Sequence, residues 1–448
     1  MDINIKNVGI VKEASVKLNG LTVIAGENDS GKSTVGKLIF ATVKAVSRYE
    51  QDLKESKEQN ILKMMEDIYV FLRNSIVEED LKTFSDVGQL FRPSFFYEHI
   101  KPYFDESSML VTNSLEVNKF LDEKEKIVML FSEAMQTRIL PKLDSLRKYI
   151  FYQESKENKI LRALRRSLYA EFYSDVSPKG NSKISKVKLN EGNTAAFQFS
   201  MKKNEIIDLK VGVALFFEDV TFIESPIVMQ MYDMISSAST LMELFNGDKS
   251  ERLYNASKAK VALHLKDLVS KLASAQYYIQ ENTGHKDHLE NIANTISGGF
   301  SFEEQEKDFA FSKKSNKKEK FKIKSVNTAS GIKSFGIIQL LIQAGFVDTR
   351  SLLIIDEPET HLHPKWQVEY ARLLVELVKN DVSILITSHS PYMIQALKVF
   401  SDKADISDRT AFYLSERTES NEFTEINEVT KNLNKLFTKL SDPLRELV

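Results

Sequence analysis

A short glycine-rich motif constrains this chain more than any other feature of its sequence. Residues 26–33 read GENDSGKS and lie between an apolar segment, 21–25, and a helical pattern. Glycines at this spacing let successive backbone N–H groups face one phosphate, while the lysine reaches the β and γ phosphates and the serine hydroxyl binds Mg²⁺. The motif therefore predicts an α/β fold with a loop that binds ATP and Mg²⁺. The loop residues are Gly26, Glu27, Asn28, Asp29, Ser30, Gly31, Lys32, Ser33 and Thr34.

A second apolar segment ends in two carboxylates. Residues 352–355 are Leu-Leu-Ile-Ile, and Asp356 and Glu357 follow them. Two carboxylates at a strand end are by themselves usual on a solvated surface. Beside a phosphate loop, however, the first carboxylate can hold Mg²⁺ through water, and the second can act as general base toward the attacking water. We therefore expect Ser33 and Asp356 to hold the metal and Glu357 to be catalytic.

A third apolar segment, 384–386, leads into a polar turn that contains His389. The carboxyl ends of parallel strands gather at one edge of a sheet. A single histidine is more often structural, but this position predicts that His389 reaches the γ-phosphate and takes part in catalysis.

The segment 328–334, TASGIKS, opens an apolar helical pattern over 335–344. Ser330 is typical of an N-cap, and a serine beside a glycine at a helix start is also typical of an anion site. A similar string at 297–299, Ser-Gly-Gly, has no long helix after it, and the phenylalanines that follow indicate a β-hairpin. We therefore assign a phosphate contact to Ser330 and Gly331.

Composition narrows the class of protein. The chain has 448 residues, is 42% hydrophobic and 28% charged, and so fits a globular protein of two or three domains. It has no cysteine, which excludes disulfides, zinc–thiolate sites and thiol catalysis. The net charge of −2 provides no overall positive field for nucleic acid. The start lacks a signal-peptide pattern, and no apolar run approaches the ~18 residues of a membrane span. We expect a cytoplasmic protein with no membrane partner.

The chain between residues 46 and 176 is almost without glycine and rich in apolar residues at helical spacing, as in Ile160, Leu164, Leu168 and Phe172. This pattern predicts amphipathic helices. Prolines break helices, so we expect several of them, separated at Pro93, Pro102 and Pro141. The stretch is interpreted as a helical insertion, which is either a subdomain packed for stability or an arm that docks a partner or nucleic acid.

The rest of the chain mixes strands with helices. Strands are expected near 197–201, 206–209 and 211–217, and the alternation of helix and strand in the last third predicts a parallel sheet. The predicted domains are an N-terminal head part at 1–45, the helical insertion at 46–176, head strands at 177–225, a second helical segment at 226–295 and a C-terminal head part at 296–448.

The order of phosphate loop, serine–glycine helix, Asp–Glu strand and histidine turn resembles the ABC-type ATPases. Within them it is similar to the branch that holds the SMC, Rad50 and RecF-like proteins and the OLD-like ATPases. The pattern I-x-N-x-G-x-V at 5–11 and the run 356–367 carry the resemblance, which covers about 1–45 and 295–415. The resemblance implies a P-loop ABC-type ATPase head with a large helical insertion.

The resemblance also implies a head-to-tail homodimer, or a higher homo-oligomer, with ATP between two heads. Ser330 would contact the γ-phosphate bound by the second copy, and the loop 359–363 would cross the interface. The family has a glutamine-bearing loop whose place here is 222–226, but that segment contains Glu224 and no glutamine, with Gln230 a little later.

Further partners follow from what the chain resembles. About 60 residues follow His389, and they lack the acidic strands of the Toprim-type nuclease that OLD-like ATPases often carry. The chain thus resembles stand-alone ATPase subunits of bacterial anti-phage systems such as PARIS or Septu, which implies a separate nuclease or toxin as effector. The alternative is a DNA-repair or chromosome-associated ATPase. A transporter subunit is disfavoured because the helical insertion is long and the serine–glycine motif is degenerate.

One basic run has two interpretations. Seven lysines lie between residues 313 and 324, namely Lys313, Lys314, Lys317, Lys318, Lys320, Lys322 and Lys324. They form either a solvated loop or a salt-sensitive contact for DNA or a DNA-mimicking protein.

Overall fold

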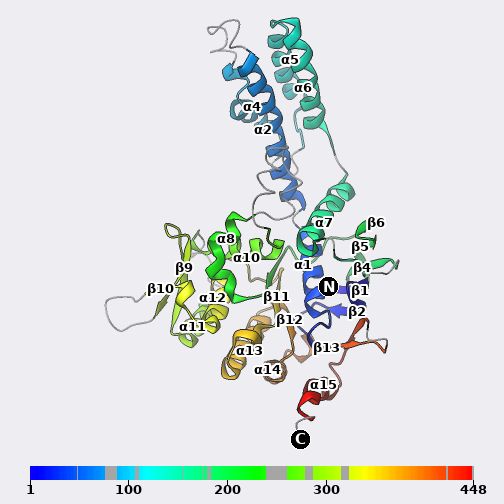
Figure 1. The fold of residues 1–448 in the computed structure, drawn as a ribbon, viewed down its shortest axis with the longest axis vertical. Coiled ribbons are helices and arrows are strands. Elements are labelled where there is room, and N and C mark those ends of the chain that lie inside the picture. Colours follow the sequence, from blue (N-terminus) through cyan, green and yellow to red (C-terminus); the bar gives the residue numbers. More distant parts are fainter. Residues whose placement is uncertain are drawn as a thin grey trace. The chain divides into compact units, whose positions relative to one another are not determined.

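The structure is a computed structural model of the 448-residue chain (Figure 1). It describes residues 1–47, 49–75, 88–105, 110–153, 155–173, 175–178, 183–238, 260–277, 286–313, 322–419 and 422–445. The chain divides into two compact units. Unit 1 comprises residues 1–47 and 161–448, and unit 2 comprises residues 48–160.

Unit 1 is built around an 11-stranded sheet with the strand order β6-β5-β4-β1-β2-β14-β13-β3-β12-β11-β7. The segment from β13 to β7 is parallel throughout, whereas β1, β2, β4, β5 and β6 pair antiparallel. The strands are β1 (Asp2–Val8), β2 (Val11–Lys17), β3 (Leu21–Gly26), β4 (Ser185–Glu191), β5 (Thr194–Lys202), β6 (Glu205–Val211), β7 (Asp219–Ile223), β11 (Ser351–Asp356), β12 (Ser383–Ser388), β13 (Thr410–Arg417) and β14 (Thr424–Glu428).

The three central parallel strands explain the apolar runs of the sequence. Every residue of β3, β11 and β12 is buried. Parallel strands covered by helices on both faces are apolar without alternation. Since all three run in the same direction, their carboxyl ends meet at one edge, which brings together the phosphate loop, Asp356 and the segment before His389.

Helices of unit 1 cover this sheet (Figure 1). The helix α1 approaches it closely, because a Cβ added at Gly36 would lie 2.9 Å from the Phe222 ring and 3.3 Å from Ile354. The α-helices are α1 (Lys32–Ser47), α7 (Lys156–Phe172, of which residues 161–172 belong to this unit), α8 (Tyr232–Ser237), α10 (Leu263–Ser274), α11 (Lys286–Thr295), α12 (Ser330–Gln343), α13 (Pro364–Lys379), α14 (Pro391–Lys403) and α15 (Leu433–Arg445).

A small antiparallel sheet of unit 1 contains the predicted hairpin. Strands β8 (Gly298–Glu303) and β9 (Asp308–Lys313) pair directly, and β10 (Lys322–Lys324) adds to β9. The strand expected at 211–217 is wrong. Residues 212–218 form no strand, and the next strand of the large sheet along the chain is β7. The strand β6 ends at Val211. Only glycine fits at position 212, because a Cβ there would lie 2.2 Å from the carbonyl oxygen of Ala195.

Unit 2 is helical in the residues that are described. Its helices are α2 (Tyr49–Ser75), α4 (Pro93–Ile100), α5 (Ser114–Val128) and α6 (Glu133–Phe151), with a short 3₁₀ turn at Lys101–Tyr103. They share one apolar core, to which α2 contributes Ile61, Met65, Ile68 and Leu72 at helical spacing.

The predicted break at Pro141 is wrong, because this proline lies inside α6. A proline within a helix costs about 3 kcal/mol. Four residues of α6, namely Ile139, Leu143, Leu146 and Ile150, are fully buried in the core, and burial of one such side chain contributes roughly 1.5–3 kcal/mol. Packing therefore outweighs the lost hydrogen bond. Pro93, by contrast, starts α4, and Pro102 lies in the 3₁₀ turn.

Candidate functional site

The phosphate loop connects β3 to α1, as the sequence predicts. Gly31 has φ +84°, and a Cβ there would lie 2.7 Å from a methyl group of Val11, so a larger residue does not fit. The hydroxyl of Ser30 is buried, and it has no hydrogen-bond partner among the described residues. An unpaired buried hydroxyl in a glycine-rich loop can donate a hydrogen bond to a phosphate oxygen.

Lys32 lies at the centre of this loop and is almost fully buried. Its Nζ donates to the carbonyl oxygens of Gly26 (3.1 Å) and Glu27 (2.7 Å) and lies 3.6 Å from Oε1 of Glu357. Burial lowers the pKa of Lys32, although the charges of Glu357 and Asp356 oppose that effect. A cation held in this way is available to the phosphates of a nucleotide.

Ser33 and Asp356 are in direct contact. The Ser33 hydroxyl donates to Oδ1 of Asp356 at 3.0 Å, and the Thr387 hydroxyl on β12 donates to the same oxygen. Burial raises the pKa of Asp356, the two hydrogen bonds oppose this shift, and the charges of Glu357 and Glu224 add to it. A divalent cation at this carboxylate would offset the excess of negative charge.

Ser33 and Asp356 suit a magnesium ion that takes its remaining ligands from water and phosphate, rather than a metal ion held by protein side chains alone. A hydroxyl and one carboxylate are oxygen ligands, which Mg²⁺ prefers, and Mg²⁺ usually takes its other ligands from water and substrate phosphates. In the described part of the chain, no group of three or more His, Cys, Asp and Glu side chains is arranged to hold a metal. Ser33 and Asp356 would therefore hold the ion together with a nucleotide.

Glu357 adopts an unusual backbone conformation. It has φ 45° and ψ 54°, in the left-handed region that costs a residue other than glycine about 1–3 kcal/mol. Its backbone N–H donates to the carbonyl oxygen (3.1 Å) and the hydroxyl (3.2 Å) of Thr387, which hold this conformation. The turn leaves the Glu357 carboxylate 3.6 Å from both Lys32 Nζ and His389 Nδ1. The two predicted catalytic residues thus lie side by side.

Glu359 points inward, although the resemblance places it in a loop that crosses a dimer interface. Its side chain is buried. Oε1 accepts hydrogen bonds from the Ser388 hydroxyl (2.8 Å) and from the backbone N–H groups of His389 (2.6 Å) and Ser390 (3.1 Å). Glu359 thereby fixes the turn that carries His389. Of the segment 359–363, only Thr360, His361 and His363 are exposed.

Ser330 does not cap its helix, so the N-cap expectation is wrong. The helix α12 begins at Ser330, and its N-cap is Ala329, without a side-chain hydrogen bond. Ser330 is exposed, and its hydroxyl has no hydrogen-bond partner among the described residues. Gly331 faces the segment after β11, since a Cβ there would lie 3.6 Å from the carbonyl oxygen of His361. Ser330 and the exposed His361 therefore belong to one region of the surface.

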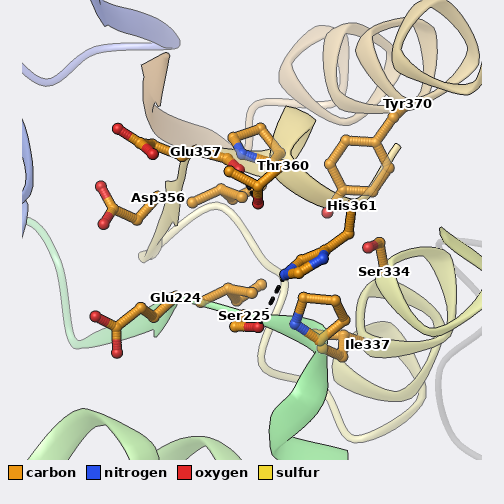
Figure 2. Close-up of a pocket in the computed structure, with 13 residues that line it drawn as sticks. Glu224, Ser225, Ser334, Ile337, Asp356, Glu357, Thr360, His361 and Tyr370 are labelled. Carbon is orange, nitrogen blue, oxygen red and sulfur yellow. Dashed lines mark hydrogen bonds between the residues drawn. The ribbon is translucent and has the colours of Figure 1, made fainter. Parts of the chain in front are cut away.

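The segment after β7 lines the site from another side. Glu224 and Ser225 border a cavity of about 20 Å³ together with Asp356 and Glu357, and Ser225 Oγ lies 3.3 Å from Nε2 of His361. Figure 2 shows the carboxylates of Glu224, Asp356 and Glu357 pointing to the same side. Gln230 does not line this cavity. Its side chain accepts a hydrogen bond from Lys333 on α12.

Three contacts of the phosphate loop come from residues that the sequence analysis did not single out. The carboxylate of Asp29 pairs with Arg417 (3.0 Å), that of Glu27 with Lys439 (3.1 Å), and the Ser415 hydroxyl donates to the carbonyl oxygen of Ser30 (2.6 Å). Ser415 and Arg417 end β13, which lies beside β3. Only the parallel-sheet pattern could have indicated that β13 ends at the loop.

The basic run is described only at its ends. Lys314, Lys317, Lys318 and Lys320 lie outside the described residues. Lys322 pairs with Glu303 (2.8 Å) and Lys324 with Glu306 (2.7 Å), whereas Lys313 is exposed. The two paired lysines have acidic neighbours that reduce their attraction for a phosphate backbone.

Comparisons with known proteins agree with this geometry. The AAA ATPase domain family model matches residues 1–394. The Septu protein PtuA of Bacillus thuringiensis is 38% identical over 52 residues, which are 12% of this chain and 13% of that protein. The chain thus matches only about an eighth of the length of this relative. The family match and the sheet topology confirm the predicted α/β phosphate-loop ATPase fold.

Several solved structures are similar at low sequence identity. The SMC head domain from Thermotoga maritima is 11% identical, with a TM-score of 0.38 and coverage of 96% of this chain and 98% of that chain. An Smc head bound to the C-winged helix domain of ScpA is 10% identical (TM-score 0.41; 97% and 98%). An ABC transporter ATP-binding cassette in its ADP conformation is 11% identical (TM-score 0.31; 99% and 96%). None of the described helices is both long and apolar enough to cross a membrane.

Proposed function

Because the chain belongs to the AAA ATPase domain family, we propose that it is an ATP-hydrolysing switch whose active site is completed by a second copy of the chain. The observation that carries the proposal is the convergence of Lys32, Ser33, Asp356, Glu357 and His389 at the carboxyl ends of β3, β11 and β12. The phosphate loop supplies backbone N–H groups and a lysine, which suit a triphosphate.

Each residue has a role that its position supports. Lys32 neutralises the β and γ phosphates, and Ser33 and Asp356 hold Mg²⁺. Glu357 accepts a proton from the attacking water. His389 lies 3.6 Å from Glu357, from where it would reach the γ-phosphate.

The second copy is inferred from Ser330. This residue is exposed at the start of α12, and none of the described contacts of Lys32, Ser33, Asp356 or Glu357 involves it. A helix start with a serine and a glycine suits a phosphate, so we assign Ser330 to the γ-phosphate held by another copy. The exposed Thr360, His361 and His363 lie in the same region and complete the interface of a head-to-tail dimer.

The cellular role that we propose is the ATPase subunit of an anti-phage system, which controls a separate nuclease or toxin. The support is the short match to the Septu protein PtuA. A DNA-repair or chromosome-associated role has less support, since the described Lys322 and Lys324 are paired with glutamates.

Two experiments test the proposal at its two levels. Purified protein should release phosphate from ATP in the presence of Mg²⁺, and the release should stop when the metal is chelated. Absence of turnover in Mg²⁺ would contradict the ATPase role. Cells that express the chain with its neighbouring genes should resist phage, and the Lys32→Ala variant should remove the resistance. Resistance that persists with Lys32→Ala would contradict an ATP-dependent defence role.

A further inference from the structure

A buried histidine joins two glutamates beside the candidate site. Nδ1 of His264 lies 2.6 Å from Oε1 of Glu171, and Nε2 lies 2.9 Å from Oε2 of Glu224. The His264 backbone N–H also donates to Oε2 of Glu171 at 3.3 Å. His264 is 1% exposed, and the Glu171 side chain is fully buried. Both ring nitrogens therefore have a carboxylate partner and no contact with solvent.

The charges of this triad and of the neighbouring Lys37 compensate one another. Burial opposes a charged imidazole, but the hydrogen bonds to Glu171 and Glu224 outweigh it and raise the pKa of His264. The hydrogen bond from His264, helped by Lys37, lowers the pKa of Glu224 to about 2 against the effect of burial. Lys37 Nζ lies 3.1 Å from the second oxygen of Glu224. Each oxygen of this carboxylate thus has its own cation.

Packing fixes the imidazole in this position. Its ring packs edge-on against two phenylalanine rings. The distance between ring centroids is 4.9 Å to Phe222 of β7 and 6.2 Å to Phe40 of α1. Ser33 and Lys37 are four residues apart on α1 and so lie on one face of it. The same helix therefore holds Asp356 through Ser33 and Glu224 through Lys37.

We propose that His264 and Glu171 are positioning residues that hold Glu224 at the metal side of the nucleotide site and connect this site to α7. The inference rests on the proposed ATPase function. Glu224 directly follows β7, which pairs with β11 beside Asp356. Its carboxylate borders the same cavity as Asp356 and points to the same side (Figure 2). A charge that disfavours a second carboxylate attracts a divalent cation, provided that it stays in place.

The connection to α7 comes from Glu171. This glutamate lies one residue before the end of α7, the helix through which the chain returns from unit 2. Movement of α7 would pull on His264 and hence on Glu224. The metal affinity of the site then depends on the position of this helix.

The test is a double-mutant cycle on metal affinity. Binding of Mn²⁺ to the protein complexed with the non-hydrolysable analogue AMP-PNP is measured by EPR, and AMP-PNP affinity is measured separately without metal. Glu224→Gln, His264→Gln and Glu171→Gln should each weaken Mn²⁺ binding roughly 10-fold, as is typical for residues behind a metal ligand. Metal-free AMP-PNP affinity should stay unchanged. The double variant Glu224→Gln/His264→Gln should be no weaker than Glu224→Gln alone, because His264 acts through Glu224.

The matched control is Ser167→Ala. Ser167 also lies on α7, and its buried hydroxyl donates to the carbonyl oxygen of Ala41 on α1 at 2.8 Å. It should leave Mn²⁺ affinity unchanged. Unchanged or tighter Mn²⁺ binding in the single variants, or effects that multiply in the double variant, would overturn the inference. If His264→Gln does not fold, the other two single variants still test the inference. Glu224 is 39% exposed, so its replacement by glutamine should be tolerated, and Glu171→Gln preserves the shape of the side chain. Failure of the wild type to bind AMP-PNP would overturn the proposed function itself.

Discussion

The hydroxyl of Ser33 donates a 3.0 Å hydrogen bond to Asp356, a residue 323 positions later in the chain. The contact follows from strand order, because β12 lies between β3 and β11 and all three end at the same edge. The hydroxyl of Thr387, near the end of β12, donates to the same oxygen of Asp356. A site for phosphate and metal is thereby assembled from segments near the start of the chain and in its last quarter.

Lys32→Ala should abolish ATP binding. The phosphates lose their main cation, while the fold should persist because burial already disfavours the charged lysine. Binding of labelled ATP by equilibrium dialysis measures the effect, with circular dichroism as the check on folding. A folded variant that binds ATP with wild-type affinity would remove Lys32 from its proposed role.

Glu357→Gln should keep ATP bound and stop turnover. The amide preserves the shape of the side chain but cannot accept the proton of the attacking water. Loss of one general base typically costs about 10²–10⁴-fold in rate. Phosphate release measures turnover, and light scattering should show an ATP-dependent dimer that accumulates. Turnover at the wild-type rate would assign the base to another residue.

Gly336→Ala should destabilise unit 1 and displace α12. A Cβ at this position would lie 2.2 Å from the ring of Phe300, and such overpacking typically costs about 1–3 kcal/mol. Gly331→Ala on the same helix is the control for stability, since its Cβ would meet nothing closer than 3.4 Å. Urea unfolding compares the two, and equal stabilities would show that β8 and α12 adjust without cost.

Stability should depend on pH through His264. Its folded pKa is raised above 6.5, so its contribution is fully present below that pH and is lost as pH rises through the raised value. The lowered pKa of Glu224 acts oppositely, with a contribution present above pH 4.5 and lost as pH falls toward about 2. His264→Gln should therefore cost roughly 3 kcal/mol near pH 6 and less at a pH above the raised pKa of His264. A difference from wild type that stays constant as pH rises from 6 to the alkaline limit of folding would contradict this assignment.

Sequence reasoning found the parts of the site that are encoded locally. The phosphate loop, Asp356, Glu357 and His389 each follow an apolar run, and the rule that parallel strands end at one edge brings them together. Contacts that depend on the approach of distant segments were missed. Glu171, His264 and Arg417 belong to no motif, and the inward direction of Glu359 depends on the 3₁₀ turn Pro358–His361.

The central claim, a site shared between two copies, is tested most directly by mixing two inactive variants. Lys32→Ala lacks a working phosphate loop but keeps Ser330, whereas Ser330→Arg keeps the loop and carries a bulky side chain at the proposed contact. Each alone should hydrolyse almost no ATP, and Ser330→Arg should still bind it. A mixed dimer contains one composite site with both parts intact, so the mixture should regain part of the phosphate-release rate. Hydrolysis by Ser330→Arg alone at the wild-type rate would contradict the shared site.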